Sequence, residues 1–353
     1  MTLVQYLQQL LAIESPTYEE KAVNDFIEQD LMALNPDFFH RCENGIICEF
    51  NADASKPRLA FVGHSDVVPD FFQPYIEHNR LHGAGASDMK GGLAAFLYFV
   101  KEHKAALLQR YNISLIVYTK EERTPIEENG LFSLFKHEGD RLKNIDCAIV
   151  AEPTDNAIQL GCLGSLHVTL SIQGKEAHSA RPWHGENALY KGLPLIQAFS
   201  QLEPKTDVID GLDFIEVMSI TECDVPKGRT TVPGELTCNI NFRFSPRRSE
   251  QDALAHVKAF CEAHAVSDMT LSLLDSAPSG SILHNAFSDT VIHCFSQKIE
   301  AKQAWTDVAQ LTQHGIPAFN FGPGLQSQAH LSNEYICIDS LSHYYALLQK
   351  LLA

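Results

Sequence analysis

The stretch RLAFVGHSD, residues 58–66, decides the fold. Its first part, 58–62, predicts a short buried strand, because the run is apolar and stops at a glycine. His64 and Asp66 follow at the point where this strand ends. In an open α/β sheet, ligands bind outside the carboxyl ends of the strands, so polar residues in this place indicate a site. Further strands of the same kind, each followed by polar residues, would complete it.

Strand and helix patterns alternate on both sides of this stretch. Apolar strands are predicted at 113–119 and 146–150, a strand hairpin at 39–50, and an amphipathic helix near the start of the chain. Further helices are predicted at 19–34, 91–103 and 129–137. Such alternation favours an α/β layer with a mainly parallel sheet.

The pattern changes at residue 165 and changes back after 277. Between them lie strands at 165–173, 214–221, 235–244 and 269–274, with helices at 187–202 and 249–265. The order β-α-β-β-α-β is that of a ferredoxin-like unit with an antiparallel sheet. We therefore predict a larger α/β domain, residues 1–164 and 277–353, that carries an inserted α+β domain, residues 165–276. A chain of 353 residues is long enough for two domains.

Composition and charge exclude several classes of protein. The net charge is −17, from 27 basic and 44 acidic residues, and such a surface repels nucleic acid and anionic membranes. No apolar run reaches the roughly 18 residues of a membrane span, and the first residues lack the features of a signal peptide. The nine cysteines form no CxxC pair, which argues against thiolate zinc sites and a disulfide framework. We expect a soluble cytoplasmic protein.

Imidazole and carboxylate groups recur where the predicted strands end. They are His64, Asp66, Asp88, Glu121, Glu122, Glu152 and His330. Such ligands without thiolates suit Zn²⁺, Co²⁺ or Mn²⁺. Clustered carboxylates repel one another, and a pair of divalent metals removes that conflict, while one further carboxylate is able to act as a general base. Taken singly, each motif is also compatible with a turn, a capped helix or a solvated loop.

The motifs together resemble those of the co-catalytic zinc peptidase and deacylase family. They are GHSDVVP (63–69), GAGASDMKGGLAA (83–95), KEE (120–122), AEPT (151–154), GKEAHSARP (174–182) and the late GPG and AH (322–324, 329–330). This family includes acetylornithine deacetylase, aminoacylase, carboxypeptidases and succinyl-diaminopimelate desuccinylase. Further strings, among them EERTPIEENGLFSL (121–134) and WTDVAQLTQHGIPAFNFGPG (305–324), are similar to the actinobacterial-type branch of the desuccinylases.

The resemblance implies a metallohydrolase domain with two divalent ions, Zn²⁺ with Co²⁺ as a possible substitute. Asp88 would bridge the two ions. His64 and Glu152 would complete the coordination of one ion, and Glu122 and His330 that of the other. The inserted domain would then be a lid and dimerisation domain.

Three further residues receive catalytic roles from the resemblance. Asp66 would hold the ring of His64 in place, and Glu121 would be the general base. His178 would stabilise the oxyanion, in relatives from the partner subunit of a homodimer; whether it acts within or across subunits stays open. The family usually has an Asp before the paired glutamates, where this chain has Lys120.

Candidate substrate contacts come from the inserted domain and from a late glycine pair. Arg243 and Arg181 are candidates for binding a substrate carboxylate, or else for structural salt bridges. Thr230 stands where the family often carries Asn. Gly322 and Gly324 are candidates for backbone N–H donors that a substrate approaches closely, or else simple turn residues.

The resemblance also implies the reaction, with no role for nucleic acid or membrane. The chain would remove succinate from N-succinyl-L,L-diaminopimelate, a step of lysine and diaminopimelate biosynthesis. The alternative substrate is another N-acyl amino acid such as N-acetylornithine, and the remote alternative is a non-catalytic relative that binds a metabolite. A serine hydrolase is excluded because no GxSxG motif occurs. Trp183 and Trp305 are expected to be packing residues.

Overall fold

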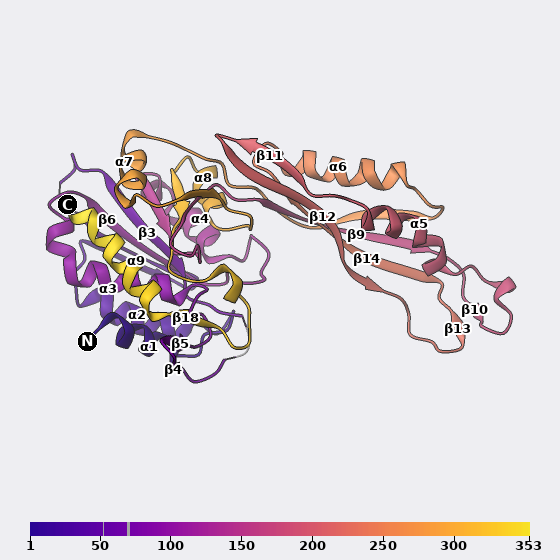
Figure 1. Ribbon diagram of the computed structural model, residues 1–353, viewed down its shortest axis with the longest axis horizontal. Coiled ribbons are helices and arrows are strands. Elements are labelled where there is room, and N and C mark those ends of the chain that lie inside the picture. Colours follow the sequence, from indigo (N-terminus) through magenta and orange to yellow (C-terminus); the bar gives the residue numbers. More distant parts are fainter. Residues whose placement is uncertain (52, 69–70) are drawn as a thin grey trace. The chain divides into compact units, whose positions relative to one another are not determined.

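The computed structural model describes residues 1–51, 53–68 and 71–353. Pro69, the last residue of the motif GHSDVVP, lies outside the described residues. The chain forms two compact units, each described by itself below (Figure 1).

The two units come from interleaved parts of the chain. Unit 1 consists of Met1–Gly161, Ser281–Glu300 and Thr306–Ala353. Unit 2 consists of Cys162–Gly280 and the short segment Ala301–Trp305. The chain therefore leaves unit 1 once for a long excursion and once more for five residues.

Unit 1 is built on an eight-stranded mixed sheet whose centre is parallel. In sheet order the strands are β1 (Phe38–Cys42), β2 (Gly45–Phe50), β6 (Asn112–Tyr118), β3 (Arg58–His64), β7 (Cys147–Val150), β17 (Ala318–Asn320), β8 (Ile158–Leu160) and β16 (Ile299–Ala301). The four neighbours β6, β3, β7 and β17 run parallel, while β1, β2 and β8 pair antiparallel. The predicted α/β class with a mainly parallel central sheet is confirmed.

Burial along these strands explains why they read as continuous apolar runs. Every residue of β2, β6, β7 and β17 is buried, and so is every residue of β3 after Arg58. Strands that are covered on both faces cannot alternate apolar and polar residues, and this is the usual situation in a parallel sheet.

The helices of unit 1 cover the sheet. They are α1 (Leu3–Leu11), α2 (Lys21–Met32), α3 (Lys90–Leu107), α4 (Gly130–Leu142), α7 (Ala286–Phe295), α8 (Val308–Gln313), α9 (Ile338–Leu348) and the short 3₁₀ helices η2 (Gln326–Gln328) and η3 (Gln349–Leu352). A small sheet of β18 (Tyr335–Cys337), β5 (Arg80–His82) and β4 (Tyr75–Glu77) completes the unit. Within the described ranges, no helix has the length and apolar content needed to cross a membrane.

The central helix α3 lies between α1 and α9 and packs on β3 (Figure 1). A glycine pair in its first turn makes this packing possible. A Cβ atom on Gly92 would lie 2.4 Å from the backbone oxygen of Ala151, and one on Gly91 would lie 2.3 Å from that of Ala86. The glycines of the GASDMKGG motif therefore bring the start of α3 against the end of β7.

Unit 2 contains a five-stranded antiparallel sheet in the order β11-β12-β14-β9-β15. Its elements are β9 (Gly164–Gln173), β10 (Ala177–His178), η1 (Pro182–His184), α5 (Ala188–Ser200), β11 (Lys205–Ile209), β12 (Leu212–Asp224), β13 (Thr231–Val232), β14 (Glu235–Phe244), α6 (Glu250–Ala263) and β15 (Met269–Ala277). Without β11, the chain order and sheet order are those of the predicted ferredoxin-like unit. The edge strand β11 was not predicted.

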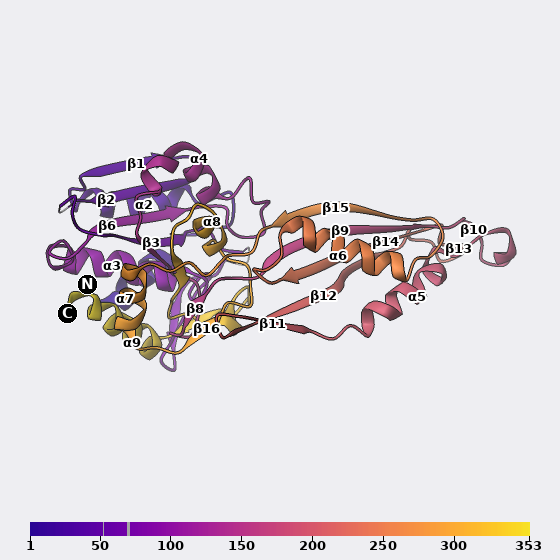
Figure 2. The ribbon, with the colours of Figure 1, turned by 90° about the horizontal axis from the view of Figure 1, so that it is seen from above.

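Both helices of unit 2 cover the same face of this sheet (Figure 2). The covered face of β9 carries Leu166, Val168, Leu170 and Ile172, all fully buried. The residues between them point to the other face and are polar. The alternation predicted for 165–173 is therefore present. The expectation for Trp183 is wrong, because its side chain is 72% exposed.

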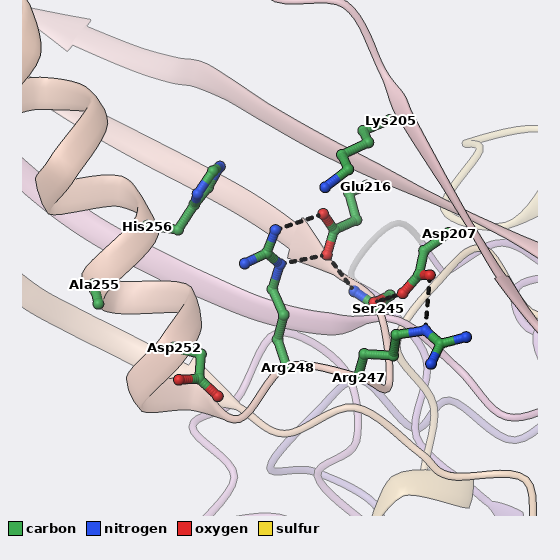
Figure 3. Close-up of a pocket in the computed structure, with 9 residues that line it drawn as sticks. All are labelled: Lys205, Asp207, Glu216, Ser245, Arg247, Arg248, Asp252, Ala255 and His256. Atoms are coloured by element: carbon green, nitrogen blue, oxygen red, sulfur yellow. Dashed lines mark hydrogen bonds and ion pairs between the residues drawn. The ribbon is translucent and has the colours of Figure 1, made fainter.

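A pocket on unit 2 is lined by charged side chains that pair with one another (Figure 3). Arg248 donates two hydrogen bonds to Glu216, at 2.7 and 3.1 Å, and Arg247 donates one to Asp207 at 2.9 Å. The Ser245 hydroxyl and amide complete the network by donating to Asp207 and Glu216. These pairs tie β11 and β12 to the end of β14, and the pocket contains none of the predicted site residues.

The Arg248–Glu216 pair predicts an acid-sensitive contribution to stability. Burial alone would raise the pKa of Glu216, but the hydrogen bonds from Arg248 and Ser245 outweigh burial and lower it. Stability from this pair is therefore present above the ordinary glutamate pKa and is lost as the pH falls through the lowered value. We expect Arg248→Met to cost about 1.5–3 kcal/mol of unfolding free energy at pH 7, and much less near pH 3.

Chemical denaturation at the two pH values measures this difference. Arg247→Met is the matched control, because its exposed pair with Asp207 contributes at most about 1 kcal/mol. An equal loss at both pH values for Arg248→Met would contradict the assignment.

Candidate metal centre

The parallel strands of unit 1 bring His64 and the predicted glutamates to one edge of the sheet. His64 is the last residue of β3 and pairs in register with Tyr118, the last residue of β6. Glu121 and Glu122 follow β6, and Glu152 follows β7. Because β6, β3 and β7 are neighbours in the sheet, the residues that follow them lie close together at the same edge.

Asp88 lies between two histidines. Its Oδ1 is 3.6 Å from Nε2 of His64, and its Oδ2 is 3.7 Å from Nε2 of His330. Nε2 of His330 is also 2.9 Å from Oε2 of Glu122. Ligand atoms of His64, Asp88 and Glu122 lie within 4.8 Å of one another. The two oxygens of one carboxylate thus face two different imidazoles, as a bridging ligand would.

Two further carboxylates border this cluster. Oε2 of Glu121 is 3.9 Å from Nε2 of His64, and its side chain is 13% exposed. Glu152 is buried and lies close enough to Glu121 to raise its pKa. The predicted ligands and base of unit 1 therefore come together from several segments of chain, with Glu121 and Glu122 on the same turn.

The cluster favours positive charge. Burial raises the pKa of Glu121 well above its usual range, and neighbouring carboxylates add to the effect. Burial alone would lower the pKa of His64, yet the carboxylates of Asp66 and Asp88 raise it well above the ordinary value. The carboxylates are hard to ionise together and the neighbouring imidazole binds a proton readily. Both effects indicate a site in which a bound cation would be stabilised.

The residues present fit a divalent metal. Nε2 of His64 is fully buried and makes no hydrogen bond within the part of the chain that the structure describes. Carboxylate oxygens of Asp88 and Glu121 lie 3.6 and 3.9 Å from it, and the imidazole of His330 lies on the other oxygen of Asp88. This donor set suits zinc and similar ions. Nε2 of His64 is therefore placed as a metal ligand would be: it is buried, it lies near carboxylate oxygens, and it has no hydrogen-bond partner among the described residues.

Asp66 connects the paired glutamates to His64. Its carboxylate accepts hydrogen bonds from the amides of Glu121 at 3.2 Å and Glu122 at 3.0 Å, and from the Thr17 hydroxyl. The same carboxylate is 3.4 Å from Nδ1 of His64, and the backbone oxygen of Asp66 is 3.0 Å from that nitrogen. One residue thus fixes the ring of His64 and the turn that carries both glutamates.

Glu334 was not predicted, and it holds the loop that carries Asp88. Its buried carboxylate accepts hydrogen bonds from the amides of Gly85, Ser87 and Asp88, at 2.7, 2.7 and 2.8 Å. The signal in the sequence was the acid of AHLSNE, four residues after His330. A single segment therefore supplies one predicted ligand and the support of another.

Lys90 is a second residue that the sequence did not mark. Its ammonium is buried and donates to the backbone oxygens of Leu10 and Ile13. Burial lowers the pKa of Lys90 to about 7, an effect opposed by Glu334 and Asp66. It joins the start of α3 to the end of α1, next to the Asp88 loop.

His178 and Thr230 are neighbours in unit 2. His178 ends β10, which pairs with β13, and the amide of Ser179 donates to the backbone oxygen of Thr230 at 2.8 Å. Nδ1 of His178 accepts a hydrogen bond from the amide of Ala180 at 3.1 Å. In the neutral ring this leaves the proton on Nε2. The exposed edge of His178 is therefore a hydrogen-bond donor.

The two predicted arginines differ in their surroundings. Arg181 is exposed. Arg243 is half-buried, burial lowers its pKa, and its Nε donates to Oδ1 of Asn241 at 3.2 Å. No acidic side chain among the described residues forms an ion pair with Arg243, so the salt-bridge alternative finds no partner there.

The glycines of the late GPG have packing roles. A Cβ atom on Gly322 would lie 2.4 Å from the backbone oxygen of Glu152, and one on Gly324 would lie 2.2 Å from that of Ser87. The Gly322 amide donates to the hydroxyl of Thr154 at 3.0 Å. The amide of Gly322 is therefore already hydrogen-bonded within the protein.

Comparison with known proteins identifies the class. Residues 60–353 match the peptidase family M20/M25/M40, and the chain belongs to this family. It is 31% identical to the succinyl-diaminopimelate desuccinylase of Corynebacterium glutamicum, over 98% of this chain and 95% of that protein. It is 27% identical to the succinyl-diaminopimelate desuccinylase of Thioalkalivibrio sulfidiphilus, over 98% and 97% of the two chains. The resemblance predicted from the motifs is confirmed.

Solved structures share the fold at low sequence identity. A tripeptidase from Staphylococcus aureus superposes with a TM-score of 0.81 at 19% identity, over 99% of this chain and 96% of that one. A dinuclear metal-binding peptidase of the M20 family from Bacillus subtilis gives a TM-score of 0.71 at 14% identity, over 99% and 96%.

The contacts of Glu334 predict a supporting role for metal binding. We expect Glu334→Gln, which keeps one acceptor oxygen, to weaken the affinity of the metal-free protein for Zn²⁺ or Co²⁺ about 10–100-fold, because the Asp88 loop loses part of its support. Titration calorimetry measures the affinity, and circular dichroism verifies the fold. The exposed Glu235→Gln is the control and should bind like the parent. Unchanged affinity in Glu334→Gln would show that the Asp88 loop does not need this carboxylate.

Proposed function

We propose that the chain is a metal-dependent amide hydrolase that removes succinate from N-succinyl-L,L-diaminopimelate. The observation that carries this proposal is Asp88 placed between His64 and His330, with Glu121 beside them. The names of the full-length relatives support the substrate. The nine free cysteines favour a reducing compartment, and we assign the reaction to the cytoplasm.

We assign the cluster to two divalent ions, and Asp88 would be a ligand to both. His64 and Glu152 would hold one ion, and Glu122 and His330 would hold the other. We expect Zn²⁺, with Co²⁺ as a substitute. When bound, such ions polarise the amide carbonyl and lower the pKa of water.

Glu121 acts as the general base in this proposal. Its carboxylate lies 3.9 Å from His64 without being hydrogen-bonded to it, and burial raises its pKa. A raised pKa suits a group that accepts a proton from the attacking water and returns it to the leaving amine. Asp66 holds the backbone of Glu121 and thereby orients this carboxylate.

Replacing Glu121 tests the base. We expect Glu121→Gln to lower kcat about 10²–10⁴-fold, because the amide side chain has the same size but does not accept the proton. Metal content, measured by elemental analysis, should stay at the parent value. The exposed Glu127→Gln should have parent kcat. If Glu121→Gln kept the parent kcat, Glu121 would not be the general base, and another group would transfer the proton.

His178 stabilises the oxyanion, and we propose that it acts across a homodimer formed through the inserted domain. Its Nε2–H is a donor, because Nδ1 accepts from the Ala180 amide. Unit 2 exposes the large apolar side chains of Trp183, Tyr190 and Leu193, which are 72%, 68% and 50% exposed. Exposed apolar groups near the same loop favour an interface with a second copy.

Mixed dimers separate action across subunits from action within one. Glu121→Gln and His178→Ala each remove activity; loss of an oxyanion donor costs about 10²–10³-fold in kcat. A heterodimer of the two variants has one intact site if His178 acts across subunits, and none if it acts within its own. We expect the mixture, after dissociation and reassociation, to regain up to about a quarter of parent activity. Analytical ultracentrifugation verifies the dimer, and an inactive mixture would contradict the assignment.

Arg243 is the residue that we assign to the free carboxylate of the succinyl group, with Arg181 and Thr230 as further candidates. The guanidinium of Arg243 is half-buried and lacks an acidic partner within the described ranges. A guanidinium binds a carboxylate with two parallel hydrogen bonds, and an acetyl group has no carboxylate to offer. N-acetylornithine remains the alternative substrate.

Steady-state kinetics on the metal-loaded enzyme test the substrate. We expect kcat/KM for N-succinyl-L,L-diaminopimelate to exceed that for N-acetylornithine at least about 100-fold, or ~2.7 kcal/mol. Arg243→Lys should reduce this preference, because an ammonium does not reproduce the paired hydrogen bonds. The opposite preference would keep the metals and the base but reassign the substrate. Turnover of neither substrate by the metal-loaded enzyme would contradict the proposed reaction.

A further inference from the structure

Two cysteines of unit 2 face each other across neighbouring strands. Cys223 lies near the end of β12 and Cys238 lies in β14, and they are direct partners in the register of the antiparallel pair. Their Sγ atoms are 3.5 Å apart. All nine cysteines lie within the described residues. This pair has no place in the hydrolytic reaction.

The backbone geometry of this pair suits a disulfide. Directly opposed residues of antiparallel strands have Cα atoms about 4.5–5.5 Å apart, and disulfides span about 4.4–6.8 Å. The sulfur atoms need to approach from 3.5 Å to about 2.05 Å, a movement that side-chain rotation supplies. The strands themselves do not have to separate or shift in register.

The two thiols differ in access to solvent. Cys223 is the one exposed cysteine of the chain, whereas Cys238 is 1% exposed and belongs to the core between the sheet and its helices. Burial raises the pKa of Cys238 to about 12. An exposed thiol next to a buried partner is the arrangement of a reacting and a resolving cysteine.

We propose that Cys223 and Cys238 form a reversible intramolecular disulfide when the protein meets a peroxide. The Cys223 thiolate attacks one peroxide oxygen, the O–O bond breaks, and with a proton the products are a sulfenic acid and one water. The Cys238 sulfur, losing its proton, then attacks the Cys223 sulfur and displaces the hydroxyl as a second water. Two thiols are oxidised by two electrons and one hydrogen peroxide is reduced to two waters.

The bond would join the two ends of the segment 224–237. This segment contains β13, which pairs with β10, and its Thr230 accepts a hydrogen bond from the residue after His178. The cross-link therefore closes a loop around the strand that supports His178. An effect on turnover would rest on the proposed function, so the test below depends on the chemistry of the two thiols alone.

The metal-loaded protein is treated with hydrogen peroxide, unreacted thiols are blocked with N-ethylmaleimide, and peptides are mapped without reduction. We expect a Cys223–Cys238 cross-linked peptide, loss of two of the nine thiols, and full recovery with dithiothreitol. Cys223→Ser should give no cross-linked peptide and should keep all of its remaining thiols after peroxide treatment. Cys294→Ser, at a half-buried site elsewhere, should behave like the parent.

Other results would overturn the proposal. One is Cys223 oxidised to sulfinic acid while Cys238 stays free. Another is an equal loss of two thiols in the parent and in Cys223→Ser, which would mean that other cysteines react. Because Cys223 is exposed, its replacement by serine tests the bond without disturbing the core.

Discussion

Mutual repulsion between carboxylates is the constraint on which the rest of unit 1 depends. The carboxylates of Asp88, Glu121, Glu122 and Glu152 meet at the ends of neighbouring strands, where burial raises the pKa of Glu121 and Glu122. Divalent cations relieve this conflict, and so do imidazoles that attract protons. Such a cluster would push itself apart unless the backbone around it were held by independent contacts.

Those contacts come from segments far apart in the chain. Asp66 holds the amides of Glu121 and Glu122, while Glu334 holds the three amides of the loop before α3. In both cases a buried carboxylate that is not itself an assigned ligand accepts from backbone N–H groups. The glycines of α3 and of the late GPG then allow the backbones to approach one another closely. The turn that carries Glu121 and Glu122 and the loop that carries Asp88 are thus each held by a buried carboxylate from another part of the chain.

The strands that mattered most for the site could be predicted because they are buried on both faces. The apolar runs before His64, Glu121 and Glu152 need no tertiary information to be recognised. Shorter strands such as β4, β5, β8 and β16 have three residues each, too few to show a period. Glu334 could not be assigned for another reason: its partners lie 246 to 249 residues earlier, and no local pattern encodes an acid that accepts from a distant loop. Trp183 was misjudged because aromatic residues are usually buried, and the sequence alone does not show that this one is exposed.

The interleaving of the two units bears on the order in which the protein is made. A growing chain contains β3, β6 and β7, with their acidic ends, long before His330 and Glu334 leave the ribosome. Unit 2, almost wholly contiguous, is complete in between. Domains generally fold as units during synthesis, so the inserted domain is able to fold while its host still lacks β17 and the last helices. A chain truncated within unit 2 would therefore keep the crowded carboxylates and lose both His330, which pairs with Glu122, and Glu334, which holds the Asp88 loop.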